Sequence, residues 1–212
     1  MQLLAMVTML IDHIGIVFFP DDQTWRMIGR IAFPFYAYGI VLGVRHTKNL
    51  KRYISRLTVI FAVSQIPYMI LFDIWRINVI GTFLAIIGIV WLLDRYYQSL
   101  IMTFAIILTS VILLESIPFE YGSYAFYLIL AYTLFTSHKL VAAHMAINIG
   151  FAFFAGWELQ LFSIIPTLAI AYGSGILTYL GRVKVPRWLW LSFYPAHITA
   201  LLIISSAMFT DR

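Results

Sequence analysis

The chain of 212 residues contains no cysteine, and only 11% of its residues are charged. The absence of cysteine excludes a disulfide framework and a thiolate nucleophile. The charged share lies far below the roughly 25% that is typical of a soluble domain. The sequence also lacks the nucleotide-binding patterns G-x-x-x-x-G-K-[ST] and G-x-G-x-x-G, which argues against an ATP-driven pump.

Apolar residues dominate instead, at 62% of the chain. A membrane-spanning helix needs about 20 such residues, so nine helices would fill most of the sequence. We expect an all-α polytopic membrane bundle, forming a single integral-membrane domain over residues 1–212. The first segment has no basic n-region and no A-x-A-like cleavage site, so we expect it to remain as a span. The expected spans are Leu3–Phe19, Ile28–Val44, Ile54–Phe72, Asn78–Leu93, Ser99–Leu114, Tyr124–Thr136, Leu140–Ala155, Leu161–Tyr172 and Leu189–Phe209.

The basic residues divide unevenly between the loops that these spans leave. Ten of the fourteen lysines and arginines fall on one side, namely Arg45, Lys48, Lys51, Arg52, Arg56, Arg95, Lys139, Arg182, Lys184 and Arg187. The other side holds Arg26, Arg30, Arg76 and Arg212. The positive-inside rule then places the N-terminus in the cytoplasm and the C-terminus outside. The net charge of +5 therefore indicates a basic cytoplasmic face and no nucleic-acid partner.

Prolines inside the spans predict bent helices. Pro34, Pro67, Pro166 and Pro195 each lie within a predicted span, where proline removes a backbone hydrogen bond and kinks the helix. Bent helices favour an internal cavity, because the freed carbonyl groups need partners. The alternative is that these prolines reflect only the high proline content of membrane helices.

The first span contains an acid and an imidazole, at Asp12 and His13. Ionisable residues within a membrane are costly and usually face a bundle interior or a water-filled cavity. Neighbouring positions on a helix point roughly 100° apart, so the two side chains need partners on different helices. We expect them to form a functional site; the alternative is a buried polar pair that only fixes helix packing.

Few other polar groups lie at suitable depth to join this pair. The candidates for a functional site with Asp12 and His13 are His197 and Tyr194 in the last span, Arg30 in the second and Asn78 in the fourth. An imidazole serves as a general base near neutral pH, and an arginine binds a carboxylate or phosphate through two parallel bonds. For Gln65, Thr82 and Asn148 we favour plain hydrogen bonding between helices.

The histidines also raise the question of a metal. His13, His144 and His197 with Asp12 could in principle bind zinc. The tight ligand spacings typical of zinc enzymes, such as H-E-x-x-H, are missing from the sequence. We therefore expect no metal.

Several short blocks of the sequence resemble the TraX family. They run in order from residue 6 to 197 and comprise Met6–Gly15, Gly29–Phe35, Gly43–Asn49, Ser64–Tyr68, Asn78–Val79, Glu120–Gly122 and Phe193–His197. The resemblance implies an acetyltransferase of the bacterial inner membrane that uses acetyl-CoA, as in the N-acetylation of F-type pilin. More distantly, the design is similar to transmembrane acyltransferases such as heparan-glucosaminide N-acetyltransferase.

Acetyl transfer needs a base for the acceptor and a donor for the tetrahedral oxyanion. His13 or His197 is the candidate base, and Asp12 the candidate group that orients an imidazole from another helix. Arg30, Asn78 and Tyr194 are candidates for binding the acceptor or the oxyanion. The acceptor is a peptide amine, a glycan hydroxyl or a lipid head group.

The cytoplasmic basic loops offer a site for the phosphates of acetyl-CoA, with Arg45, Lys48, Arg52 and Arg182 as the candidate ligands. The alternative is that these residues only set the topology. Two other function classes also stay open. One is a small proton-coupled transporter or permease, because intramembrane Asp and His also form proton relays. The other is a non-catalytic assembly partner.

Overall fold

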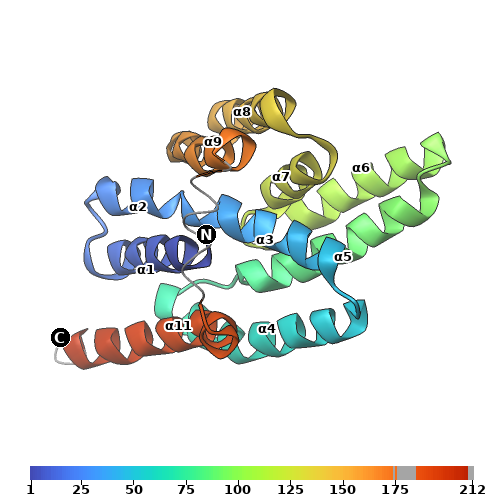
Figure 1. The fold of residues 1–212 in the computed structure, drawn as a ribbon. Helices are drawn as coiled ribbons and strands as arrows, with labels where there is room; N and C mark the ends of the chain where they lie inside the picture. Colours follow the sequence, from blue (N-terminus) through green and yellow to red (C-terminus); the bar gives the residue numbers. More distant parts are fainter. Residues whose placement is uncertain (174, 176–184, 210–212) are drawn as a thin grey trace.

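The computed structural model describes residues 1–173, 175 and 185–209, and in this part of the chain the fold is all-α (Figure 1). The helices are α1 (Gln2–Phe18), α2 (Gln23–Gly29), α3 (Ala32–His46), α4 (Leu50–Phe72), α5 (Val79–Tyr96), α6 (Leu100–Ser116), α7 (Gly122–Leu134), α8 (Ser137–Ala155), the 3₁₀ helix η1 (Glu158–Ser163), α9 (Ile164–Tyr172) and α11 (Arg187–Phe209).

Five of the described helical stretches are long and apolar enough to cross a membrane: Gln23–His46, Leu50–Phe72, Val79–Tyr96, Ser137–Ala155 and Arg187–Met208. Four shorter apolar stretches complete the set: Gln2–Phe18, Leu100–Ser116, Gly122–Leu134 and Glu158–Tyr172. These nine stretches coincide in order with the nine expected spans. The predicted all-α fold is therefore confirmed for the described residues, and five of the predicted spans are long and apolar enough to cross a membrane. The exact number of crossings and the orientation stay predictions.

Helix α3 lies at the centre of the bundle. It contacts α1, α4, α5, α7 and α9, and its buried residues include Phe33, Phe35 and Val41. Helices α4 and α11 lie side by side on one flank, and α7, α8 and α9 form the other (Figure 1). The core therefore forms around α3, with α5 and α7 contributing the largest buried side chains, Phe83, Tyr124 and Phe126.

The four prolines do not all act alike. Pro67 and Pro195 lie inside the continuous helices α4 and α11. Pro34 and Pro166 lie in the first turns of α3 and α9, directly after interruptions of their spans. The second span is thus broken at residues 30–31 and the eighth begins as a 3₁₀ helix. Both interruptions lie at the same end of the bundle, where η1 contacts α2 and α3.

Candidate functional site

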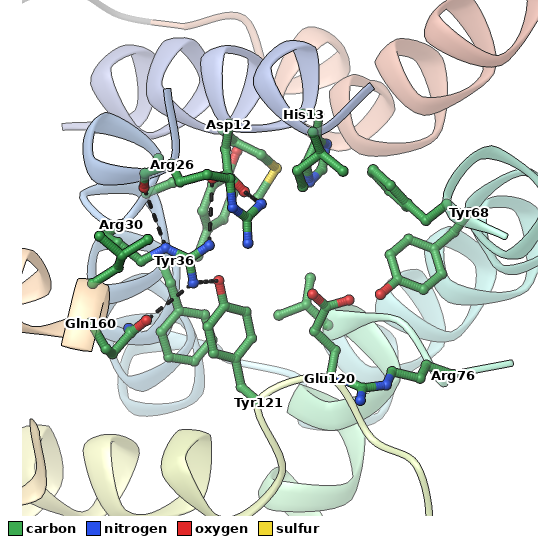
Figure 2. Close-up of a pocket in the computed structure, with 18 of the residues that line it drawn as sticks. Asp12, His13, Arg26, Arg30, Tyr36, Tyr68, Arg76, Glu120, Tyr121 and Gln160 are labelled. Atoms are coloured by element: carbon green, nitrogen blue, oxygen red, sulfur yellow. Dashed lines mark hydrogen bonds and ion pairs between the residues drawn. The ribbon is translucent and has the colours of Figure 1, made fainter. Parts of the chain in front are cut away.

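A cavity of about 430 Å³ opens where these interruptions meet. Helix α1, the α2–α3 break and the end of α4 form part of its wall. The connections 73–78, 117–121 and 156–157 form another part, and η1 and Tyr194 of α11 complete it. Figure 2 shows the labelled polar side chains around the central space, with His13 on one side and Glu120 on the opposite side. A cavity of this size is typical of small-ligand sites.

Asp12 fastens α1 to α2 through two ion pairs. Its Oδ2 atom lies 3.1 Å from Arg26 Nη1, and its Oδ1 atom lies 3.5 Å from Arg30 Nη2. The two arginines are four residues apart, so they share one face of the chain. Gly29 between them allows this approach, because a Cβ atom there would lie only 2.0 Å from Asp12 Oδ1. Asp12 as a whole residue is 7% exposed, so the charge of its carboxylate depends on these partners.

His13 points in a different direction, as the helical geometry predicts, and meets α11. Its Nδ1 atom lies 2.8 Å from Nε2 of His197, whose own Nδ1 lies 2.6 Å from the carbonyl oxygen of Phe193. A carbonyl only accepts, so His197 Nδ1–H is the donor and its Nε2 accepts from His13 Nδ1–H. In the neutral pair this order leaves Nε2 of His13 without a proton. His13 lines the cavity, and His197 positions it from behind.

Arg30 connects the broken second span to η1. Its Nη1 group donates to Gln160 Oε1 at 3.1 Å and to the Tyr121 hydroxyl at 3.5 Å, while its Nε–H donates to the Arg26 carbonyl at 3.3 Å. With the ion pair to Asp12, the guanidinium group has a partner on every side. Arg30 therefore holds the walls of the cavity together.

The connection 117–121 presents Glu120 and Tyr121 to the cavity. It is held by a parallel bridge to Ile77 and by a 2.8 Å hydrogen bond from the Thr82 hydroxyl to the Glu120 carbonyl. Tyr121 adopts a left-handed backbone conformation with φ of 62° and stacks on Phe33 with ring centroids 3.9 Å apart. Such strained positions often occur at functional sites. Burial, reinforced by the charge of Asp12, raises the pKa of Glu120 to about 7, although Arg30 and Arg26 oppose the shift.

Buried polar atoms without a hydrogen-bond partner concentrate in this cavity. In the part of the chain that the structure describes, the buried side-chain atoms without a hydrogen-bond partner are Asp12 Oδ1, Tyr36 OH, Glu120 Oε2 and Gln160 Nε2. All four belong to residues that line the cavity. An unpaired buried polar atom costs about 1–3 kcal/mol, so this cavity is suited to a polar occupant.

A second polar cluster lies in the core between α7, α8 and α9, and we call it the sealed network. His144 Nε2 lies 3.0 Å from the Tyr124 hydroxyl and 3.1 Å from Ser163 Oγ, and His144 Nδ1 lies 2.6 Å from Thr167 Oγ1. Asn148 completes the network through Tyr124 and Ser163. All five residues are fully buried, and none of them belongs to the cavity wall.

The structure brings most of the predicted catalytic and acceptor residues together. Asp12, His13, Arg30 and Tyr194 line the cavity, and His197 contacts His13. Asp12 pairs with the two arginines, so its partner is not an imidazole. His197 takes that orienting position. Within the described chain, no three His, Cys, Asp or Glu side chains gather as metal ligands.

Asn78 has a different place from the one expected for an acceptor-binding residue. Its Oδ1 atom caps α5 by accepting from the backbone of Ile80 and Gly81, and its Nδ2 group donates to Ser64 Oγ at 3.1 Å. It is fully buried outside the cavity lining. The side chain therefore fixes the start of α5. Gln65, Thr82 and Asn148 also hydrogen-bond between segments, as the sequence suggested.

The basic loop between α3 and α4 lies at the far end of α3 from the cavity. Arg45, Lys48 and Arg52 are exposed there, and Arg45 donates to the carbonyl of Thr133. Fifteen helical residues separate the two ends of α3, which corresponds to about 22 Å. Arg182 and Lys184 lie outside the described residues.

The sequence reasoning missed Arg26, Arg76, Glu120 and Gln160 as site residues. Arg26 carries a usable signal, since it lies four positions before Arg30 in a weakly charged chain. The other three come from connections or from a 3₁₀ turn. Neither periodicity nor spacing predicts where such side chains point.

The family model of the TraX protein matches residues 1–205. The chain belongs to the TraX family. The matched range includes every residue of the cavity wall. A curated relative, the probable fimbrial assembly protein FimC of serogroup H1 from Dichelobacter nodosus, is 26% identical over 240 residues, covering 99% of this chain and 95% of the relative. No solved structure matches the TraX chain significantly.

Proposed function

We propose that this TraX-family protein is a multi-pass acetyltransferase of the bacterial cell (inner) membrane that transfers the acetyl group of acetyl-CoA to an acceptor bound in the cavity. The observation that carries the proposal is the hydrogen-bonded series from the Phe193 carbonyl through His197 to His13. An imidazole fixed in one tautomer beside a polar cavity is the arrangement of a general base with its orienting group.

The proposed reaction uses His13 Nε2 to take the proton of the acceptor amine or hydroxyl. The acceptor atom then bonds to the thioester carbonyl carbon, and the tetrahedral intermediate breaks its carbon–sulfur bond. The proton held by His13 passes to the departing CoA thiolate, which leaves as the thiol. The guanidinium group of Arg30 supports this step, because fixed positive charge stabilises the oxyanion of the intermediate.

Acetyl-CoA, the acetyl donor, is proposed to approach from the end of α3 that lies away from the cavity. Arg45, Lys48 and Arg52, with Arg182, would bind the phosphates of acetyl-CoA. The acetyl group would then reach inward along α3 toward His13, which lies near its other end. This arrangement agrees with a cytoplasmic N-terminus, nine spans and an outer C-terminus, because the basic loop would then face the cytoplasm.

The acceptor proposed is a peptide N-terminus, a cell-envelope glycan or a lipid head group at the outer side of the membrane. The relative's name as a probable fimbrial assembly protein supports a role related to pili. In that setting, a pilin N-terminus is the acceptor to test first.

A transporter is the second candidate, and the two interrupted spans favour it. Breaks at residues 30–31 and before α9 both border the cavity, and transporters often bind their substrates at broken helices. The discriminating experiment measures free CoA released from acetyl-CoA by the purified protein with an amine acceptor. Release that depends on His13 supports the enzyme. Solute movement across liposomes without CoA release supports the transporter. Absence of CoA release, with the protein's cellular function intact in both D12N and H13A, supports a non-catalytic assembly partner.

A further inference from the structure

The cavity wall carries more positive than negative charge. Arg26, Arg30 and Arg76 line it together with Asp12 and Glu120. Asp12 is shared between Arg26 and Arg30. In the described chain, no carboxylate lies within ion-pair distance of Arg76. The arginines therefore leave a net positive charge inside a concave site, which favours an anion.

The position of these arginines strengthens the argument. In the predicted topology, four basic residues fall on the outer side, and Arg26, Arg30 and Arg76 are three of them. Outer loops usually carry few basic residues. Three arginines line one cavity on the side of the membrane where basic residues are usually few, which indicates that a ligand binds there.

The available hydrogen-bonding groups define what this ligand must offer. Arg30 is occupied by Asp12, Gln160 and Tyr121, but Arg26 contacts Asp12 through Nη1, and its side chain is 32% exposed. Arg76 is exposed, and Gln160 Nε2 is a donor buried without a partner. These groups require an acceptor such as an oxyanion. Glu120 Oε2 is a buried acceptor without a hydrogen-bond partner and requires a donor such as an amine or a hydroxyl.

We propose that the acceptor substrate carries an oxyanion, a phosphate or a carboxylate, next to the amine or hydroxyl that receives the acetyl group. Arg26 and Arg76 bind the oxyanion. When the acceptor is an amine, one N–H donates to the unpaired oxygen of Glu120 while the other gives its proton to His13 Nε2; a hydroxyl has a single proton, which goes to His13. This inference rests on the proposed acetyl transfer. It narrows the substrate class from any amine or hydroxyl to an anionic one.

The experiment compares amines that differ in their anionic group. Ethanolamine, O-phosphoethanolamine and β-alanine are offered to the purified protein with acetyl-CoA, and free CoA is measured. We expect the KM for O-phosphoethanolamine or β-alanine to be about ten- to a hundredfold below that for ethanolamine, because each charge-assisted contact contributes strongly. R76Q should remove this difference while the KM for acetyl-CoA stays unchanged. R95Q, an exposed arginine of α5, is the matched control and should behave as the wild type.

A further arm distinguishes the source of the anion. Phosphatidylethanolamine in nanodiscs replaces the soluble amines, and N-acetyl lipid is measured by mass spectrometry. Acetylated lipid assigns the phosphate to a head group, while acetylation of the soluble compounds alone assigns it to a soluble or polymer-borne group.

The outcomes separate the two proposals. Equal KM values for all three amines in the wild type and in R76Q overturn the anion site and leave acetyl transfer standing. If no amine causes CoA release above the level of H13A, acetyl transfer fails. Inorganic phosphate then tests the site alone: a raised unfolding temperature in the wild type but not in R76Q supports anion binding, and no rise overturns it.

Discussion

The cavity and the sealed network both contain histidine, tyrosine and an amide side chain, yet they satisfy these groups in opposite ways. In the sealed network, both ring nitrogens of His144 have partners, and Tyr124, Ser163 and Asn148 bond to one another. In the cavity, Asp12, Tyr36, Glu120 and Gln160 each have one buried side-chain atom without a hydrogen bond. The first arrangement needs nothing further, while the second needs a ligand or water.

The difference shows how to separate structural from functional polarity inside a membrane protein. A saturated network of side chains fastens helices, and here it holds the interrupted eighth span, η1 and α9, against α7 and α8. An incompletely paired set beside a cavity gives up stability and keeps groups available for a substrate.

Replacing His13 should separate the two regions most clearly. H13A should lower the rate of acetyl transfer by about 10²–10⁴-fold, the range for a lost general base, while the protein still inserts into the membrane. H144Q alters the sealed network and should leave the rate per folded molecule within a few-fold of the wild type, but lower its unfolding temperature. CoA release and thermal unfolding are measured for both variants. A large rate loss in H144Q but not in H13A would show that the chemistry depends on His144 and would contradict the assignment to His13.

Replacing Gly29 tests the two ion pairs of Asp12 with Arg26 and Arg30, which we call the Asp12 clamp, without removing any of the three charges. G29A would put a Cβ atom 2.0 Å from Asp12 Oδ1, so the carboxylate must move away from Arg26 and Arg30. We expect about a hundredfold lower acetyl transfer, since small displacements of positioned groups have effects of this size. G39A in α3 is the matched control, because a Cβ atom there meets nothing within 4 Å. Equal activity of the two variants would show that the clamp does not position the site.

The basic loop should affect only the donor. Changing Arg45, Lys48 or Arg52 singly to glutamine should raise the KM for acetyl-CoA by up to about tenfold and leave the KM of the acceptor unchanged, as expected for lost binding of one substrate. R95Q again serves as the control. If these changes alter only insertion or orientation, the loop is a topology signal and the donor site lies elsewhere.

Replacing Glu120 should have a smaller effect, on the stability of the folded protein and on how that stability depends on pH. Its pKa of about 7 in the folded protein exceeds the ordinary value of 4.5, so the folded state holds the proton more tightly. The favourable contribution is complete below pH 4.5 and is lost as the pH rises through 7. E120Q should therefore unfold several degrees above the wild type at pH 8, at about 2–4 °C for each kcal/mol.

Most of this stabilisation should disappear by pH 5, where the Glu120 carboxyl is protonated in the folded protein. E158Q replaces an exposed glutamate of η1 and should change the unfolding temperature little at either pH. A stabilisation of E120Q that is the same at pH 5 and pH 8 would contradict the ionisation of Glu120 as its cause.

The sequence predicted the elements of the fold better than the walls of the site. Long apolar runs identify spans, because a membrane requires them, and the helical period placed Asp12 and His13 on different partners. Glu120 and Gln160 could not be predicted, since their directions depend on how a loop and a 3₁₀ turn pack against α3. Asn78 was assigned to the acceptor, although an asparagine at the start of a span is also a typical helix cap.

The most direct test of the account is a double-mutant cycle of His13 and His197, read as CoA release by the wild type, H13A, H197A and the double variant. If His197 acts only by positioning His13, then H197A slows the wild type but adds almost nothing to H13A, because residues that act as a unit are not additive. The account predicts that the double variant matches H13A. Near-full turnover in H13A, or a double variant slowed by the product of the two single effects, would contradict it.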